Sequence, residues 1–495
     1  MARRAGTLLT IDLGGTGTKA VLHGVDGERL GRGYVGYHLR YGADGSVELD
    51  AGTWLDAART ATAAALAASG RAASEILAVS VTSTNALLAL GADGQPLRPA
   101  IMQLDRRATA EVEALGLDDS LREQITRLAG NQPGPMFWLP VLRWLRRHEP
   151  APFRQAAVFL YPSGYLVQQL TGRATIDVTR AATTLLHNPF ADEWAPELVE
   201  AAGIRPAQLP VCLPSAMVAG RTTASGGARL GLPAGIPVLA GCMDSVAGAL
   251  GAGALRAGDA AVFFGTVART AVVADRPVPA PLSICCPHAA PGSWLNMSIA
   301  SAGGAVLNWV SRNLYRNEPF DVLGAEATRA AERGGDGVRF AFAQGRSNEP
   351  AGIPVSGGTV QLSAGLHHDR SDVAYAALRM IANGLAAQLA AQAARGLAVD
   401  RVTVTGGGAN LASWVQLLAT ATGRRVRVPA VLDTESAGSG MLAAVGAGIH
   451  PDLAAAHAAM APEWAEVAPG PPEGTVFAVR GTDRTARDEP TEEGR

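Results

Sequence analysis

The feature that most constrains the fold of this chain is a pair of apolar segments joined by a short turn of glycine and threonine, which occurs twice. It appears first in residues 8–22, "LLTIDLGGTGTKAVL", and again in residues 261–275, "AVFFGTVARTAVVAD". Apolar, β-prone runs on both sides of a turn predict two strands rather than a strand and a helix. The repeat therefore predicts a fold that is built twice within one chain.

The first turn places three glycines, two threonines and Lys19 directly after Leu13. It matches neither G-x-x-x-x-G-K-[ST] nor a G-x-G-x-x-G that opens a helix. A hairpin rich in glycine can aim several backbone N–H groups into one concavity, which suits an anion. An ordinary glycine hairpin is the alternative that this stretch alone leaves open.

Composition limits the classes of partner. The chain has 495 residues, enough for several domains, and its 42 basic and 44 acidic residues nearly cancel. No basic run points to nucleic acid and no apolar 18-residue run points to a membrane, so we expect a cytoplasmic protein. The four cysteines lack C-x-x-C spacing and are interpreted as reduced thiols: Cys212, Cys242, Cys285 and Cys286.

Strand-like and helix-like segments alternate up to about residue 250, which predicts an α/β architecture. Thr53 followed by Asp56 predicts a capping box at the start of an alanine-rich helix, and residues 76–84 predict a strand. Residues 400–423 predict a strand, a triple-glycine turn and a helix. Beyond about residue 450 the composition is typical of a tail.

Six blocks, by their content and by their order along the chain, resemble the FGGY family of carbohydrate kinases (xylulose, gluconate and glycerol kinase-like), within the actin-like ATPase superfamily, up to about residue 450. "DLGGTGTK" and "FFGTVA" are similar to the two phosphate loops of the family, and "VTGGGANLASWVQLLA" to its adenosine-binding loop. "GLPAGIPVLAGCMDSVAGALGAG" resembles the block that carries the catalytic aspartate, and "GADGQPLRPAIMQLDRRA" and "PVLRWLRRHEP" resemble blocks on the substrate side.

The resemblance implies an α/β fold of two duplicated RNase H-like domains with an active-site cleft between them. Residues 1–250 are expected to form the substrate-binding domain and residues 251–455 the nucleotide-binding domain. Residues 456–495 are expected to form a partly disordered tail.

The resemblance also implies roles for particular residues. Asp244 is the expected general base and a substrate contact, with a helix N-cap as the alternative, and Asp12 is the expected Mg²⁺ ligand, with a strand-end turn cap as the alternative. ATP is expected to contact Gly14, Gly15, Thr16, Lys19, Gly265, Thr266, Gly406, Gly407, Gly408 and Gly440. The substrate is expected to contact Gln103, Asp105, Arg107 and Trp138.

The sugar side departs from the family pattern. Gln103 stands where tryptophan is common, Val141 where lysine is expected, and Arg180 where aspartate is frequent, while Ser163-Gly164 replaces a Lys-Asp pair. The phosphate and adenosine blocks are kept. These departures leave the substrate more open than the reaction.

The sequence thus predicts ATP- and Mg²⁺-dependent phosphorylation of a hydroxyl on a small sugar, sugar acid or polyol, with a ketose such as a pentulose favoured. The alternative is a catalytically silent relative that binds nucleotide or sugar as a regulator; a relative that hydrolyses ATP for a protein partner would predict an inserted domain. The expected partners are ATP and a small polyhydroxylated substrate, with no nucleic acid or membrane. A homodimer is the assembly considered.

Overall fold

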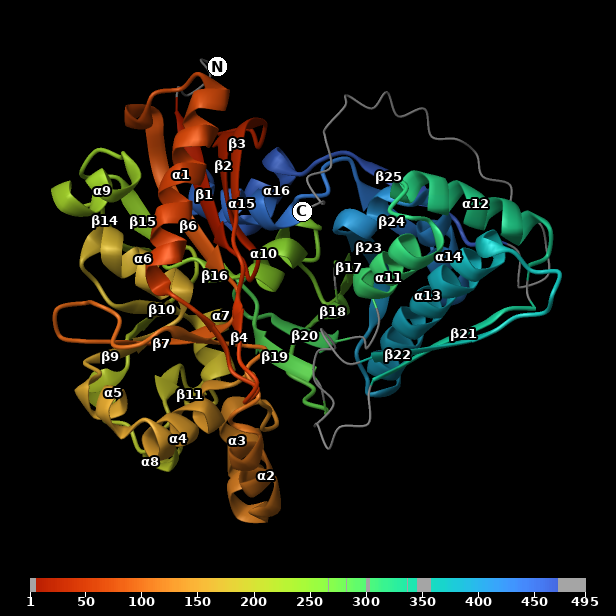
Figure 1. The fold of residues 1–495 in the computed structure, drawn as a ribbon. Coiled ribbons are helices and arrows are strands. Elements are labelled where there is room, and N and C mark those ends of the chain that lie inside the picture. Colours follow the sequence, from red (N-terminus) through yellow and green to blue (C-terminus); the bar gives the residue numbers. More distant parts are fainter. Residues whose placement is uncertain are drawn as a thin grey trace.

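The structure is a computed structural model that describes residues 6–265, 267–281, 283–299, 303–335, 337–344 and 358–470. Two large sheets organise it, one in each half of the chain. Figure 1 shows the first half as the lobe on the left, coloured red to yellow-green, and most of the second half as the lobe on the right.

The first large sheet has the strand order β14-β15-β6-β1-β2-β3, with β16 also paired to β6. Its strands are β1 (Thr7–Leu13), β2 (Gly17–Gly24), β3 (Arg29–Gly36), β6 (Ile76–Ser83), β14 (Val218–Arg221), β15 (Pro237–Leu239) and β16 (Cys242–Met243). Helices cover both faces of this sheet: α1 (Ala51–Ser69) packs on β2 and β3, and α15 (Thr434–Gly446) packs on β1 and β6. The central strand β1 is therefore buried on both faces, and its sequence is a nearly continuous apolar run.

The second large sheet has the order β19-β20-β18-β17-β23-β24-β25. Its strands are β17 (Gly258–Phe264), β18 (Ala268–Ala274), β19 (Ser283–Pro287), β20 (Trp294–Ile299), β23 (Val399–Thr405), β24 (Val426–Pro429) and β25 (Trp464–Val467). In both sheets a hairpin, β1–β2 or β17–β18, is followed by a parallel neighbour, β6 or β23. The predicted α/β class and the predicted repetition of the fold are confirmed.

Smaller elements complete the two lobes. The first lobe adds β4 (Arg40–Tyr41), β5 (Val47–Leu49), β7 (Ala86–Leu90), β8 (Ala100–Met102), β9 (Val158–Leu160), β10 (Thr175–Asp177), β11 (His187–Asn188), β12 (Glu193–Trp194), β13 (Val211–Leu213), α2 (Thr109–Leu117), α3 (Asp119–Ala129), α4 (Trp138–His148), α5 (Pro150–Gln155), α6 (Pro162–Thr171), α7 (Val178–Ala181), α8 (Pro196–Ala202) and α9 (Ala224–Leu230). The rest of the chain adds α10 (Asp244–Gly251), α11 (Gly304–Leu314), α12 (Phe320–Glu332), β21 (Arg339–Gln344), β22 (Gly358–Ser363), α13 (Arg370–Ala394), α14 (Ala412–Thr422) and α16 (Leu453–Met460).

Helices α10 and α15 join the two halves. They cross so closely that a methyl group added at Gly251 would overlap the Thr434 carbonyl, and one added at Gly438 would overlap the Ala247 carbonyl. The apolar cluster around them takes buried residues from both large sheets, among them Leu8 of β1 and Phe263 of β17. The halves therefore share one core at this crossing.

One local prediction is wrong. Helix α1 begins at Ala51, and its N-cap is Asp50, whose side chain accepts a hydrogen bond from the Gly52 N–H at 2.9 Å, so Thr53 is not the cap. A partly disordered tail is expected over residues 456–495; within it the structure describes the end of α16 and β25, which pairs with β24. Residues 471–495 lie outside the described residues.

Within the described ranges, no helix combines the length and the apolar character that crossing a membrane requires.

Replacing Gly438 with alanine tests the helix crossing. The added methyl must push α10 and α15 apart, and we expect a loss of about 1–3 kcal/mol in the free energy of unfolding, the usual cost of overpacking. Gly384 in α13 is the matched control because a methyl group there meets no atom within 4 Å. Gly384→Ala is expected to stabilise the helix by roughly 0.5–1 kcal/mol. Thermal or urea unfolding measures both, and equal effects would contradict the crossing.

Candidate active site

The carboxyl ends of three parallel strands meet at one edge of the first sheet. Strands β1 and β16 both pair in parallel with β6, and Asp12 and Cys242 both lie opposite Thr82. Asp244 follows β16 directly. Asp12 and Asp244 therefore flank the end of β6, although 232 positions of sequence separate them.

Asp12 is half-buried and lies among charged groups. The Thr82 hydroxyl donates a hydrogen bond to its Oδ1 at 2.9 Å. Burial raises the pKa of Asp12 above its ordinary value; Lys19, opposite in the hairpin register, opposes the rise, and the charge of Asp244 adds to it. A carboxylate held this way gains from a cation placed beside it.

Asp244 is the first residue of α10, and the N-cap is Met243, so the alternative that Asp244 is the N-cap is wrong. Its Oδ1 accepts hydrogen bonds from the Ser245 N–H at 2.7 Å and the Ser245 hydroxyl at 3.1 Å. The side chain is 25% exposed. The carboxylate is thus fixed by its neighbour and still reaches solvent.

A chain of hydrogen bonds that the sequence did not reveal holds Asp244 in place from behind. The Met243 N–H donates to the Thr179 hydroxyl at 2.9 Å, and that hydroxyl donates to Asp177 Oδ1. Asp177 also accepts the N–H groups of Thr179 and Arg180, which caps α7. Burial raises the pKa of Asp177 to about 6, and these donors oppose the rise.

Arg180, noted in the sequence only as a departure, lies beside Asp244. Its Nη2 is 3.7 Å from Asp244 Oδ1, and its side chain is only 2% exposed. Its guanidinium stacks over Tyr161 at 5.1 Å, and Tyr161 stacks on Trp138 at 4.4 Å. Nε and Nη2 have no hydrogen-bond partner among the described residues, so two buried donors at this position are unfilled.

Lys19 makes the ion pair that crosses between the halves. Its Nζ donates to Asp433 Oδ1 at 2.6 Å and lies 3.7 Å from Glu435 Oε2. Burial alone would raise the pKa of Asp433, but Lys19 lowers it overall to about 2. The ammonium that was expected to contact phosphate is therefore already paired, through a partner 414 positions away that sequence reasoning missed.

The two hairpin turns leave open space at their tips. Gly14 closes the first turn, its N–H donating to the Gly17 carbonyl at 2.9 Å. A methyl group added at Gly15 would come no closer than 3.9 Å to the Thr84 hydroxyl, and one at Gly265 no closer than 3.7 Å to the Val267 carbonyl.

Of the other two residues expected at these turns, Thr16 is exposed at the tip of the first. Thr266 lies outside the described residues.

The three glycines after β23 have different roles. Gly406 has a φ of 87°, and a methyl group there would meet the Phe264 carbonyl at 2.8 Å. A methyl group at Gly408 would overlap the Phe264 ring, whereas one at Gly407 would meet no atom within 4 Å. Gly406 and Gly408 therefore serve the fold, and Gly407 is the glycine that faces open space.

Gly440 is not brought to this loop. It lies in the buried part of α15, where a methyl group would meet the His23 ring at 3.4 Å. A methyl group there would be in ordinary van der Waals contact with the ring, and only a side chain larger than alanine would press on it.

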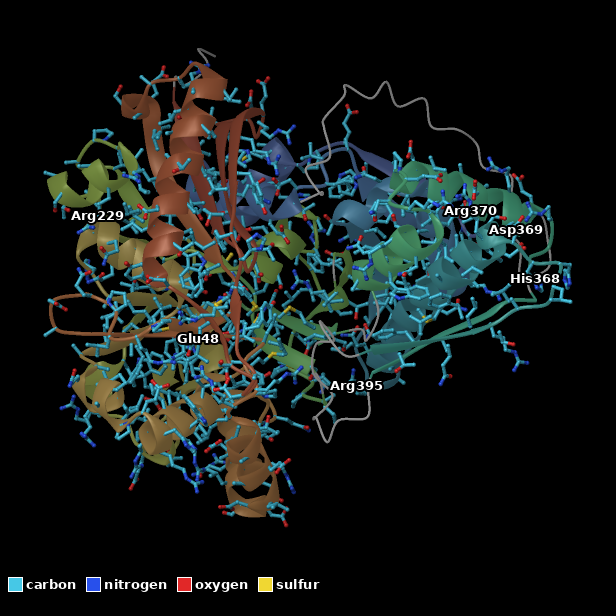
Figure 2. All side chains as sticks on the ribbon, in the orientation of Figure 1. Glu48, Arg229, His368, Asp369, Arg370 and Arg395 are labelled. Carbon is cyan, nitrogen blue, oxygen red and sulfur yellow. The ribbon has the colours of Figure 1, made fainter. Side chains whose placement is uncertain are left out.

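Asp105 and Arg107, expected as substrate contacts, bind each other. Arg107 Nη2 donates to Asp105 Oδ2 at 2.6 Å and to Glu48 Oε1 at 2.8 Å, and its guanidinium stacks over Trp144 at 4.4 Å. Asp105 Oδ2 also accepts the Val47 N–H at 2.9 Å. Figure 2 places Glu48 in the first lobe among closely spaced side chains. The pair therefore joins β5 to the loop after β8.

The other two expected substrate contacts also differ from each other. Trp138 is 1% exposed and forms a wall behind Tyr161, with its indole N–H unpaired among the described residues. Gln103 is half-buried; its backbone N–H donates to the Asn85 carbonyl at 3.0 Å, and its side chain makes no hydrogen bond with the described part of the chain. Gln103 is thus the more available of the two.

Two sheets built on one plan, with Asp12 and Asp244 at the strand ends of the first and open glycine turns in both halves, define a two-lobed α/β protein. The chain belongs to the FGGY family of carbohydrate kinases: the family's N-terminal domain matches residues 7–251 and its C-terminal domain residues 254–447. It is therefore a carbohydrate kinase, and membership implies ATP as the phosphoryl donor.

Known proteins of similar sequence and structure agree with the family. The chain is 28% identical over 489 residues to an autoinducer-2 kinase of Klebsiella pneumoniae, covering 94% of this chain and 90% of the relative. It is similar to the crystal structure of a xylulose kinase from Rhodospirillum rubrum, with a TM-score of 0.81, 26% identity and 94% of each chain covered. A gluconate kinase from Lactobacillus acidophilus, 23% identical with a TM-score of 0.82 over 94% of each chain, shares the fold.

Replacing Gly407 with valine tests the open loop. If nucleotide fills the space beside it, the branched side chain raises KM for ATP about tenfold or more, equal to about 1.4 kcal/mol of binding, and leaves the melting temperature unchanged. Gly408→Val is the matched control, since its side chain must displace Phe264 and lower the melting temperature. Loss of stability in both variants, with KM for ATP unchanged in Gly407→Val, would make the whole loop structural.

The raised pKa of Glu435 predicts that the stability of the fold depends on pH. Burial raises its pKa from 4.5 to about 7; Lys19 opposes the rise, and the charge of Asp12 adds to it. The folded state keeps a proton that the unfolded chain loses, so this contribution to stability is complete below pH 4.5 and is lost as the pH rises through about 7.

Glu435→Gln is therefore expected to reduce the fall in melting temperature of the ligand-free protein between about pH 5 and pH 8. The exposed Glu463→Gln serves as control, and identical pH profiles for wild type and Glu435→Gln would contradict the prediction.

Proposed function

We propose that this carbohydrate kinase transfers the terminal phosphoryl group of ATP to a hydroxyl of a small polyhydroxylated substrate at the strand edge that carries Asp12 and Asp244. The observation that supports it most is the pairing of both β1 and β16 with β6, which sets two carboxylates at one edge. One of them, Asp244, is partly exposed and has no ion-pair partner closer than 3.7 Å among the described residues.

Asp244 is proposed to act as the general base. Its Oδ1 is held by Ser245, so a substrate hydroxyl can donate to the other oxygen and pass its proton there as the bond to phosphorus forms. Arg180 lies beside the same carboxylate, with its Nη2 3.7 Å from Oδ1. Such a positioned base is worth about 10²–10⁴-fold in rate.

The carboxylates of Asp12 and Glu435 fit Mg²⁺, because this ion prefers carboxylate oxygens as ligands. Asp12 is the residue that would hold the ion, and Glu435, whose pKa is raised in part by Asp12, is a second oxygen donor nearby. Bound Mg²⁺ would neutralise charge on the transferring phosphoryl group. The open turns at Gly15 and Gly265 are proposed to contact the phosphates, and Gly407 the adenosine.

The substrate class is proposed from the site and from the relatives together. Trp138 and Tyr161 give an aromatic wall, and the unfilled donors of Arg180 favour an acceptor rich in oxygen. Similar proteins bear the names autoinducer-2 kinase, xylulose kinase and gluconate kinase. A ketose such as a pentulose, a sugar acid or a polyol fits this setting.

A screen for ADP release tests the proposal. Purified protein with ATP and Mg²⁺ is offered ketoses, aldonates, linear polyols and autoinducer-2, and we expect one class to raise ADP release far above the rate with water alone. Binding of a sugar or nucleotide without turnover across the panel would favour the catalytically silent regulator instead. Isothermal titration with a non-hydrolysable ATP analogue distinguishes that outcome from an inactive preparation.

Asp244→Asn is the decisive variant. Asparagine keeps the oxygen that accepts the Ser245 bonds, so the fold is expected to melt close to wild type while kcat falls by at least about 10²-fold, because the amide cannot take the proton. KM for ATP is expected to change little.

A true helix cap provides the matched control: Asp452 caps α16 by accepting the Ala455 N–H at 2.8 Å, and Asp452→Asn is expected to keep its turnover. Normal kcat in Asp244→Asn would remove Asp244 from the mechanism.

A further inference from the structure

Three segments outside the proposed kinase site, β11, the turn after it and β13, meet beside β10. His187 begins β11, Asp192 lies in the turn between β11 and β12, and Cys212 is the central residue of β13. One ligand atom from each, a ring nitrogen, a carboxylate oxygen and the thiol sulfur, all lie within 4.8 Å of one another. Figure 1 shows β11 in the lower part of the first lobe.

The ring nitrogens of His187 lack hydrogen-bond partners among the described residues. The side chain is 1% exposed, and both nitrogens are buried. The edge of the ring packs against Trp194 at 5.4 Å, which holds its orientation. Burial lowers the pKa of His187 to about 4, so the ring is neutral at pH 7, the form that binds metal ions. A buried polar group without a partner is costly unless something binds it.

The two other side chains supply the charges. Asp192 Oδ1 is 3.5 Å from His187 Nε2, and its side chain is 70% exposed on a residue with a φ of 53°. The Cys212 thiol is partly buried, and burial raises its pKa, so without a cation it stays protonated. A divalent ion bound to one thiolate and one carboxylate makes a group of zero net charge, and the attraction between the ion and its ligands offsets part of the cost of burying the charges.

We propose that His187, Asp192 and Cys212 form a site for a divalent cation of the zinc type. Imidazole, thiolate and carboxylate are ligands of Zn²⁺, at bond lengths of about 2.0–2.3 Å, and three such ligands leave a fourth position for water. The ion enters from the exposed Asp192 side, and the thiol proton goes to solvent when the sulfur binds. Mg²⁺ avoids sulfur and nitrogen ligands, so this site is separate from the proposed Mg²⁺ position.

The ion would tie a hairpin to the part of the lobe that supports the active site. Trp194 Nε1 already donates to the Pro210 carbonyl at 3.3 Å, which brings β12 to the start of β13. In the β10–β13 pair, Cys212 lies opposite Ile176, and Asp177 is the next residue of β10. The site therefore stabilises the strand that ends in the cap of α7.

Cobalt binding tests the proposal without using activity. Protein stripped of metal with a chelator is titrated with Co²⁺, and we expect one equivalent to give a near-ultraviolet sulfur-to-cobalt charge-transfer band and visible bands of a tetrahedral ion, both displaced by Zn²⁺. Co²⁺ at the oxygen ligands around Asp12 gives no sulfur band, so the two positions are distinguishable. Bound zinc is also expected to raise the melting temperature.

Variants assign the ligands. Cys212→Ala is expected to abolish the sulfur band, and Cys285→Ala, which removes another buried thiol, is expected to keep it. Asp192→Asn changes an exposed side chain, so it folds whatever the other variants do, and is expected to weaken Zn²⁺ binding at least about tenfold, a loss seen even for residues that only orient a ligand. Absence of the sulfur band in wild-type protein, or its persistence in Cys212→Ala, would overturn the proposal and leave a buried thiol beside a histidine.

Discussion

The close crossing of α10 and α15 is the contact on which the rest of the structure depends. Glycines at positions 251 and 438 let the backbone of each helix touch a carbonyl of the other, and the apolar cluster around them draws on both large sheets. Because α10 begins at Asp244 and α15 follows Asp433, the same crossing fixes both acidic residues relative to β1. The packing that joins the two halves therefore also sets the positions of Asp244 and Asp433 at the carboxyl ends of the strands.

Charge balance at that edge follows from the crossing. Asp12, Asp433 and Glu435 lie close enough to interact: the charge of Asp433 raises the pKa of Asp12 and of Glu435, and the charge of Asp12 raises that of Glu435. Lys19 offsets part of this repulsion through its ion pair with Asp433. The unbalanced negative charge that is left suits a divalent cation, which could in turn hold a phosphate group.

Local patterns predicted much of the fold but only part of the candidate site. The strands around Asp12, the repeated hairpin and the helix after Asp244 could be predicted because apolar runs and turns are encoded in adjacent residues. Asp105 and Arg107 were expected at a substrate because polar residue types alone do not show whether they already bind each other. Gly440 was assigned to a pocket for the same reason, since a glycine that permits helix packing looks identical in sequence to one that borders a ligand.

The sequence by itself determined the α/β class, the doubled hairpin and the family, because strand propensity, glycine turns and motif order are local properties. Only the tertiary structure decided which polar side chains meet: Lys19 with Asp433, Arg180 with Asp244, and His187 with Asp192 and Cys212. These side chains come from segments that no spacing rule connects. Their proximity depends on strand register and on helices packing across the whole core, and those are decided by burial of apolar surface summed over the entire chain.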